Sequence, residues 1–364
     1  MAKLGDYVKI RTGKLDANAS SESGQYPFFT CAIEPLKIDS YSYDCECVLV
    51  AGNGDLNVKY YSGKFDAYQR TYIIESMDKT FLDVQYLYFF MDKYLETLRS
   101  QSIGGVIKYI KLGNLTEADI FIPSIERQRK IVQILRKSRK LISLRKQQLA
   151  KLDELVKARF VEMFGDPVSN PKHWKTAFIL DIGYCKNGMN FHKGDSGVDI
   201  HCLGVGDFKN RTMIQNVEDL PFVSLNELPD PEYLLRDNDI IFVRSNGNKE
   251  LVGRCLAIYP GSIPVTYSGF CIRYRLTSTN IDTPYLLQVL KTDSIRKKMT
   301  GRGANIQNLN QQTLSQLLVP IPPLSLQNEF AAFVERVDQQ KQTIQQSLEK
   351  LELMKKVLMQ EYFG

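Results

Sequence analysis

The stretch IPSIERQ at residues 122–128 opens a long run without glycine or proline, and IPPLSLQ at residues 321–327 opens a second one. The two stretches lie 199 residues apart, and a match at the same offset continues on both sides of them. The matched positions pair Tyr86 with Tyr285, Gly104 with Gly303, Ile107 with Ile306, Leu115 with Leu314, Gln128 with Gln327, Leu152 with Leu351 and Phe164 with Phe363. A long repeat in two copies predicts two similar lobes, and two similar lobes suggest two similar ligand sites.

The composition is typical of a globular protein with more than one domain. The chain has 364 residues, of which 43% are apolar, and the usual domain size predicts two or three domains. The duplication favours two. No stretch approaches the roughly 20 apolar residues that cross a bilayer, and the N-terminal residues lack the apolar core of a signal peptide. We therefore expect a cytoplasmic protein.

The cysteines and histidines do not show metal-ligand spacing. The seven cysteines form no CxxC pair, and the three histidines do not lie at ligand intervals from them. Cys45 and Cys47 are separated by one residue, which is more typical of alternation in a strand than of half a metal site. We predict free thiols, no metal and no cofactor.

The net charge of +6 permits a polyanionic partner without requiring one. The charge is unevenly distributed between the two copies. Residues 126–165 hold twelve Lys or Arg against four acids, whereas residues 325–364 hold five against six. The basic tract at residues 136–140 has three interpretations: a stripe that faces DNA, a docking face for an acidic partner, or a solvated helix surface.

Each copy has the pattern of a mixed α/β lobe followed by a long helix. We expect strands at residues 47–51, 58–61 and 70–74 and a helix at 83–99 in the first lobe, and strands at 240–244, 254–259 and 270–276 and a helix at 285–299 in the second. The prolines at the end of each lobe should stop one element before the long helix begins. Ser124 and Ser325 are plausible N-caps of the long helices.

The long helices, at about residues 126–163 and 325–362, would each be roughly 55 Å long, which is unusual for a globular protein. Each has one wholly apolar heptad row. The first row is Leu135, Ile142, Leu149, Val156 and Met163, and the second is Phe330, Val337, Ile344, Leu351 and Leu358. We predict that these rows form the seam of an antiparallel helix pair. The alternatives are that each helix packs on its own lobe, or that the chain dimerises through the helices.

The sequence thus predicts an α+β fold, with two similar mixed α/β lobes separated by a long antiparallel two-helix coiled coil and related by a pseudo-twofold repeat. We expect the first lobe at residues 1–120, the first helix with its linker at 121–168, the second lobe at 169–318 and the second helix at 319–364.

Motifs of common catalytic sites are missing from the sequence. There is no GxxxxGK[ST] phosphate loop, no Asn-Pro-Pro-aromatic or Asp-Pro-Pro-aromatic tetrapeptide of an amino-methyltransferase, and no GxSxG or HExxH motif. Asp237 and Asp239 are more typical of a turn that enters a strand. We therefore expect no enzymatic activity.

Polar and basic loops remain as candidate binding elements. Residues 50–54 and 243–247 have a matching pattern, because each is an apolar strand that runs into an Asn-Gly turn. Asn, Arg and Lys side chains suit base edges and phosphates. The candidate DNA-binding residues are Asn53, Lys59, Arg70, Lys108, Arg244, Asn246, Asn248, Lys249, Arg254 and Arg273. The alternative is structural, since Asn-Gly is a common hairpin turn and strand arginines are often only solvated.

Several short motifs, in their order along the whole chain, resemble the specificity subunits of Type I restriction-modification enzymes. They are the two junctions at residues 122–128 and 321–327, the stretch GANIQNL at 303–309, FGDP at 164–167 and Asn170-Pro171. The first copy departs from the pattern at Ser124, which replaces the second proline, and at Lys108-Tyr109.

The resemblance implies a non-catalytic chain in which each lobe is a target-recognition domain for one half of a bipartite DNA site. It further implies that the paired helices set the spacing of the half-sites, that two methyltransferase subunits dock along them, and that endonuclease/translocase subunits join for cleavage. The alternatives are a coiled-coil scaffold without a nucleic-acid role, and a cryptic nuclease or methyltransferase.

Overall fold

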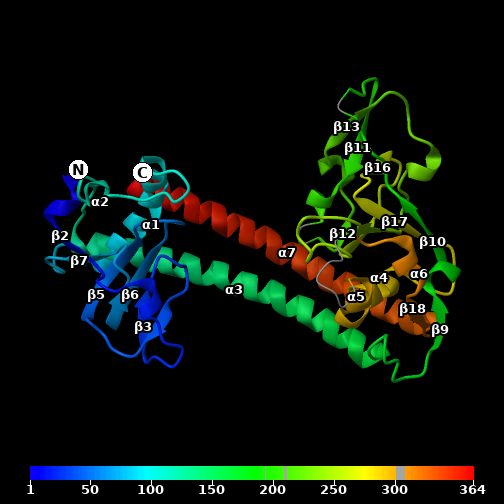
Figure 1. Cartoon of the computed structure of the whole chain (residues 1–364), viewed down its shortest axis with the longest axis horizontal. Helices are drawn as coiled ribbons and strands as arrows, with labels where there is room; N and C mark the ends of the chain where they lie inside the picture. The colour runs from blue at the N-terminus through cyan, green and yellow to red at the C-terminus, as the bar shows by residue number, and fades with distance from the viewer. Residues whose placement is uncertain (193, 209–210, 301–307) are drawn as a thin grey trace. The chain divides into compact units, whose positions relative to one another are not determined.

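The computed structural model describes residues 1–192, 194–208, 211–300 and 308–364 (Figure 1). The chain forms two compact units. Unit 1 comprises residues 1–147 and 344–364, and unit 2 comprises residues 148–343. Each unit therefore contains one lobe and one half of each long helix. The repeat positions Gly303 and Ile306, and most of the GANIQNL stretch, lie outside the described residues.

The lobe of unit 1 is built on a six-stranded sheet with the order β2-β7-β5-β6-β3-β4. Its strands are β2 (Val8–Thr12), β3 (Tyr26–Phe29), β4 (Leu36–Ile38), β5 (Tyr43–Ala51), β6 (Val58–Ala67) and β7 (Thr71–Ser76). Neighbours are antiparallel except β3 and β6, which are parallel. The three strands expected here are confirmed as parts of β5, β6 and β7.

Helix α1 (Val84–Gln101) packs on β5 and β6 and confirms the helix expected at residues 83–99. Asp83 caps the helix, because its carboxylate accepts hydrogen bonds from the backbone of Gln85 and Tyr86 at 2.8 and 3.0 Å. The apolar face of α1 closes a core that also includes Leu135 from one long helix and Met359 from the other. Burial of this apolar surface stabilises the unit.

The lobe of unit 2 has two sheets, a five-stranded one with the order β10-β17-β14-β15-β12 and a three-stranded one with the order β13-β11-β16. The strands of these sheets are β10 (Gly183–Asn187), β11 (Val198–Leu203), β12 (Met213–Ile214), β13 (Phe222–Leu225), β14 (Asp239–Val243), β15 (Cys255–Ile258), β16 (Val265–Tyr267) and β17 (Cys271–Leu276). The strands expected at 240–244, 254–259 and 270–276 are confirmed as β14, β15 and β17.

The strand connectivity repeats between the two units. The antiparallel run β2-β7-β5-β6 of unit 1 corresponds to β10-β17-β14-β15 of unit 2. The parallel pair also recurs, since Phe29 lies opposite Ala67 in unit 1 and Leu203 lies opposite Tyr267 in unit 2. The internal duplication seen in the sequence is therefore a duplication of the fold.

The helix expected at residues 285–299 is two helices, α4 (Thr283–Lys291) and α5 (Asp293–Thr300). The break falls at Thr292, which is extended and whose hydroxyl donates to the Val289 carbonyl at 2.7 Å. The prediction of one helix was wrong because Thr and Asp bond locally to the backbone and favour helix ends over interiors.

Small elements complete each lobe. They are β1 (Ala2–Lys3) paired with β8 (Asp119–Ile120), β9 (Lys175–Phe178) paired with β18 (Leu318–Ile321), the short helices α2 (Leu112–Thr116) and α6 (Gln311–Ser315), and 3-10 turns at Leu4–Asp6, Ala17–Ala19, Ile179–Asp181, Val205–Asp207, Val217–Asp219 and Pro231–Tyr233.

The long helices are α3 (Ile125–Phe164) and α7 (Leu324–Phe363), each of 40 residues. Ser124 caps α3 as expected, since its hydroxyl lies 3.4 Å from the Arg127 backbone nitrogen. Ser325 is not a cap, because α7 begins one residue before it, directly after Pro323. Proline fixes the backbone geometry that suits a helix start.

The halves of α3 and α7 pair antiparallel within each unit. In unit 2, Asp153 bonds Lys341 at 2.5 Å and Arg159 bonds Glu329 at 3.0 Å, so α7 numbers fall as α3 numbers rise. In unit 1, Lys146 bonds Glu352 at 2.8 Å. Of the expected seam residues, Leu135, Val156, Met163, Phe330 and Val337 are buried, whereas Ile142, Leu149, Ile344, Leu351 and Leu358 are half-buried.

In the described part of the chain, no helix is long and apolar enough to span a membrane.

Candidate nucleic-acid interface

Three of the candidate residues of unit 1 come together where β5 ends. The Gly52 nitrogen donates to the Arg70 carbonyl at 2.7 Å, and the Gly54 nitrogen donates to the Lys108 carbonyl at 2.9 Å. Asn53, between the two glycines, forms an isolated bridge with Tyr109. Gly54 has a φ of +68°, which favours glycine. The backbone thus gathers Asn53 and the exposed side chains of Arg70 and Lys108 beyond the C-terminal end of the central strand β5.

Lys59 lies further along β6 and differs from these three residues. It is half-buried, its ammonium donates to the Asn57 side chain, and burial lowers its pKa. Its register partner is Leu49, in the middle of the sheet. Lys59 therefore stands apart from the loop group.

The corresponding loop of unit 2 follows β14. The Leu309 nitrogen donates to the Arg244 carbonyl at 2.7 Å, and Ser245 forms an isolated bridge with Asn308. Asn246 and Asn248 each accept from a backbone nitrogen two residues ahead, at 2.8 and 3.0 Å. These bonds are Asx turns, and they order the loop.

Strand register corrects the expected match between the two Asn-Gly turns. Val48 pairs with Ile74 in unit 1, and Ile240 pairs with Tyr274 in unit 2. These two pairs occupy the same place in the two sheets, so Val48 and Ile240 are equivalent positions. Counting forward from these positions, Asn53 corresponds to Ser245, not to Asn246. The sequence pattern alone missed this shift of one residue because both loops contain Asn-Gly.

The remaining candidates of unit 2 fall into two groups. Lys249 is exposed and Arg254 is half-buried, and both belong to the segment between β14 and β15. Arg273 is fully buried; its guanidinium lies 5.1 Å from the Tyr184 ring centre and donates to the Glu232 carbonyl at 2.9 Å. A side chain in that position does not reach a nucleic acid, so we remove Arg273 from the candidate DNA contacts.

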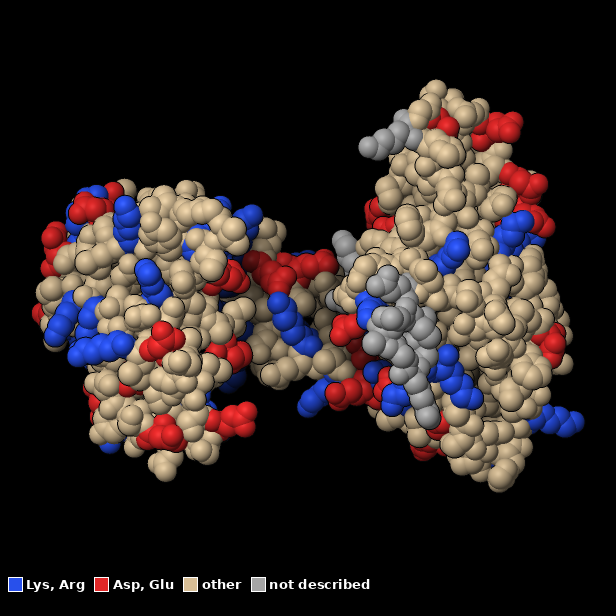
Figure 2. Space-filling view, in the orientation of Figure 1, with Lys and Arg blue, Asp and Glu red and all other residues tan. Residues whose placement is uncertain are grey.

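Charge on the surface is mixed. On the face drawn in Figure 2, Lys and Arg side chains are interspersed with Asp and Glu on both units. The first half of α3 is basic, but its cations differ in their surroundings. Lys137 and Lys140 are exposed, whereas Arg136 and Arg139 bond to residues of α1.

A buried glutamine joins each lobe to its long helix. The Gln128 side-chain oxygen accepts from the Asp83 nitrogen at 2.9 Å, and its amide nitrogen donates to the carbonyls of Phe81 and Pro123, both at 2.8 Å. Gln128 is fully buried. The amide is thus satisfied by backbone groups on both sides of the junction, which fixes the orientation of the helix on its own lobe.

Unit 2 repeats this joint at the same 199-residue offset. Gln327 accepts from the Asp282 nitrogen at 2.9 Å and donates to the carbonyls of Asn280 and Pro322 at 3.0 and 2.8 Å. A tyrosine accompanies each glutamine: the Tyr86 hydroxyl donates to the Phe121 carbonyl at 2.7 Å, and the Tyr285 hydroxyl donates to the Pro320 carbonyl at 2.9 Å. The sequence marked these residues as repeated, but only the structure shows their role.

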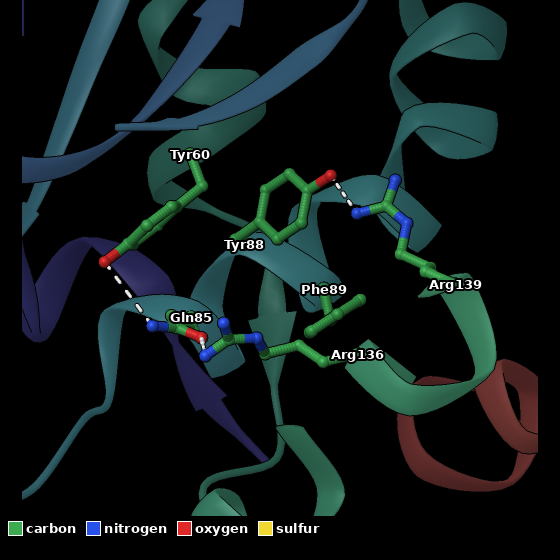
Figure 3. A pocket seen from close by; sticks show the side chains of 6 residues that line it. All are labelled: Tyr60, Gln85, Tyr88, Phe89, Arg136 and Arg139. Carbon is green, nitrogen blue, oxygen red and sulfur yellow. Dashed lines mark hydrogen bonds between the residues drawn. The ribbon is translucent and has the colours of Figure 1, made fainter. Parts of the chain in front are cut away.

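A pocket of about 320 Å³ lies beside this joint in unit 1 (Figure 3). It is lined by Tyr60, Gln85, Tyr88, Phe89, Arg136 and Arg139. Arg136 points at Gln85, and Arg139 points at the Tyr88 hydroxyl. The sequence interpretation missed this pairing because 51 residues separate the partners in each bond.

Four of the thiols, three of them on buried residues and Cys185 on a half-buried one, are poor nucleophiles. Burial raises the pKa of Cys185, Cys202 and Cys271 to about 12 and that of Cys255 to about 11. A thiol is reactive as its thiolate, so a raised pKa makes these side chains inert near neutrality. Within the described ranges, no three or more His, Cys, Asp or Glu residues form a group that could hold a metal ion.

Comparison with known proteins places this architecture in a family. The family profile described as "Type I restriction modification DNA specificity domain" matches residues 1–154 and 171–353. The Type I restriction enzyme EcoDI specificity subunit of Escherichia coli is 26% identical, over 95% of this chain and 82% of the relative. The MjaVIII specificity subunit of Methanocaldococcus jannaschii is 21% identical, over 99% and 90%. The chain therefore belongs to the Type I restriction-modification DNA specificity family.

Solved structures show the same fold. The Type I restriction-modification S subunit from M. genitalium aligns with a TM-score of 0.63 and 16% identity, covering 100% of this chain and 95% of that one. A chain from a study of complex assembly and conformational transition of the type I restriction-modification system aligns with a TM-score of 0.58 and 13% identity, over 100% and 96%.

Proposed function

We propose that this chain is the non-catalytic DNA-reading subunit of a Type I restriction-modification complex and that each lobe reads one half of a two-part DNA sequence. The observation that carries the proposal is the duplicated fold, in which two lobes share their strand connectivity and their glutamine joint but differ in their loops. A common framework with different loops suits two different half-sites. Such a subunit acts on cellular DNA, so we assign it to the cytoplasm.

The loop residues near the C-terminal ends of β5 and β14 are the proposed contacts. In unit 1 these are Asn53, Arg70 and Lys108, and in unit 2 they are Arg244, Asn246, Asn248, Lys249 and Arg254. Arg and Asn can form bidentate hydrogen bonds with guanine and adenine edges, whereas Lys and Arg also bind phosphates. Lys59, which is half-buried and bonded to Asn57, is at most a supporting residue.

The long helices are the proposed spacer between the half-sites and the docking surface for two methyltransferase subunits, with endonuclease/translocase subunits joining the full complex. A stiff helix pair converts helix length into base-pair separation, as dimer geometry does in other DNA-binding proteins. The seam residues Ile142, Leu149, Ile344 and Leu351 are only half-buried. Part of their apolar surface therefore remains for the docking of other subunits.

The decisive experiment removes one heptad from each helix, residues 145–151 and 345–351, which keeps the phase of the apolar rows. Each helix shortens by about 10 Å, or about three base pairs. Mapping methylated sites in cells should then show unchanged half-site sequences with a shorter spacer.

The control replaces the same two segments by heptads of equal length that keep the apolar positions, and it should leave the spacer unchanged. Altered half-site sequences, or an unaltered spacer in the shortened chain, would contradict the proposal. Methylation without any sequence preference would favour a scaffold that does not read DNA.

A further inference from the structure

The joint between lobe and long helix has a second layer, and this layer differs between the units. Around the shared tyrosine and glutamine, five positions change together at the 199-residue offset. In unit 1 they are Gln85, Tyr88 and Asp92 on α1 with Arg136 and Arg139 on α3; in unit 2 they are Pro284, Leu287 and Lys291 on α4 with Glu335 and Asp338 on α7.

In unit 1 the lobe supplies acceptors and the helix supplies arginines. Arg136 donates to the Gln85 side-chain oxygen at 3.1 Å (Figure 3). Arg139 donates to the Tyr88 hydroxyl, its guanidinium lies 4.9 Å from the centre of that ring, and its other nitrogen lies 3.7 Å from the Asp92 carboxylate. Each arginine therefore has a partner on α1.

Asp92 is held between both long helices. The Lys355 ammonium on α7 lies 3.9 Å from the same carboxylate oxygen that faces Arg139. The Asp92 side chain is only 23% exposed, so solvent screens these attractions incompletely. An anion of the lobe thus lies between two cations of the helix pair.

In unit 2 the signs are reversed. Lys291 occupies the position of Asp92, and Asp338 occupies that of Arg139. Burial lowers the pKa of Lys291, and the nearby carboxylates of Asp338 on α7 and Asp153 on α3 oppose this effect. Lys341 links the same two carboxylates, at 3.6 and 2.5 Å. Here the lobe contributes the cation Lys291, and the helix pair contributes two carboxylates together with Lys341. Pro284 and Leu287, in place of Gln85 and Tyr88, have no side-chain acceptor for an arginine.

We propose that the charges and hydrogen-bonding groups at these five positions determine which part of the helix pair each lobe packs against. We call these five positions the identity code. The second lobe on the first half of α3 would bring Lys291 against Arg139 and Lys355, without an acceptor for either arginine. The first lobe on α7 would bring Asp92 against Asp338 and Asp153, whose charges Lys341 offsets only in part. Such repulsive pairs discriminate between alternative partners more strongly than the shared attractive contacts do.

Opposite signs in the two copies also argue against a DNA contact at these positions. Phosphates are negative along the whole duplex, so residues that bind them would be basic in both units. The code therefore concerns assembly of the chain and is independent of the function proposed above.

The test measures hydrogen exchange of the α1 amides by mass spectrometry in the full chain. We expect Asp92→Lys and Arg139→Glu each to raise exchange in α1 by tenfold or more, because each places like charges together. The double variant D92K/R139E restores opposite charges and should exchange more slowly than either single variant. Peptides from α4 serve as an internal reference and should not change.

The matched control is Lys137→Glu with Lys140→Glu, which changes charge on exposed positions of the same helix and should leave α1 unaffected. If single reversals destabilise the chain too much for purification, Asp92→Asn and Lys291→Gln replace them, with smaller increases confined to α1 and α4 respectively. Single reversals within twofold of the parent chain, or a double variant no better than the worse single, would overturn the code. DNA is absent from this assay, so a failure of the proposed DNA-reading function would leave the result untouched.

Discussion

In both units the same glutamine joint attaches a lobe to its long helix, but the residues around this joint differ between the units. Gln128 and Gln327 make the same three hydrogen bonds to backbone groups at equivalent positions. Around them, the loops and the charges differ. Residues whose bonds set the geometry of the joint are thus alike, whereas the residues proposed to contact DNA or to identify a lobe differ.

The largest expected difference between the units concerns their sheet ion pairs. In unit 2, Asp239 accepts from Arg275 through both oxygens at 2.7 Å, and these side chains are 1% and 12% exposed. Asp239→Ala leaves a nearly buried guanidinium without its charged partner and should lower the free energy of unfolding by about 3–5 kcal/mol in urea titrations.

Unit 1 has an ion pair on its sheet at different positions: Arg11 on β2 lies 2.7 Å from Glu75 on β7, and this pair is more exposed than the pair of unit 2. Glu75→Ala should therefore cost about 1 kcal/mol or less. Equal losses in the two variants would contradict the role we assign to burial.

The glutamine joint should matter equally in both units. Gln128→Leu and Gln327→Leu each remove three hydrogen bonds to backbone groups at the junction, and each should lower the free energy of unfolding by about 3 kcal/mol. Denaturant unfolding of the full chain measures this loss. The controls Gln133→Leu and Gln339→Leu, at exposed positions of the same helices, should change the free energy of unfolding little. If only one of the two joint variants lost stability, the two joints would not be equivalent.

Substitutions in the loops of the two units should affect different half-sites of the DNA sequence. Arg70→Ala should relax the sequence preference at one half-site, and Asn248→Ala should relax it at the other. A lost bidentate base contact costs about 1–3 kcal/mol, or roughly ten- to hundredfold in affinity. Binding to DNA libraries randomised in one half-site at a time measures both effects. If one variant changed both half-sites, the assignment of one half-site to each lobe would fail.

The tyrosines of the joint should give the smallest effect. Tyr86→Phe and Tyr285→Phe each remove one hydroxyl that donates to a carbonyl and should cost about 1 kcal/mol. Burial raises the pKa of both hydroxyls, that of Tyr86 to about 12, so both donate over the whole neutral range and the loss should not vary between pH 6 and 9. A clear dependence on pH in thermal unfolding would contradict this account.

Sequence patterns predicted the repeated helices and strands better than they predicted helix breaks and the register of loops. The apolar rows of α3 and α7 and the strands β5, β7, β14 and β17 followed from periodicity, which local residues specify. The break at Thr292 and the one-residue shift between the Asn-Gly turns did not follow, because each depends on hydrogen bonds and strand register that a pattern leaves open.

By itself, the sequence determined that this protein has two related halves, that each ends in a long helix, and that the helices carry an apolar seam. Tertiary structure alone decided which polar side chains remain available to a partner. Arg273 looks like its neighbours in the sequence but is buried, and Arg136 and Arg139 belong to a basic tract but bond to α1. The physical reason is that burial and pairing depend on groups about 40–50 residues away in the chain, which local patterns do not specify.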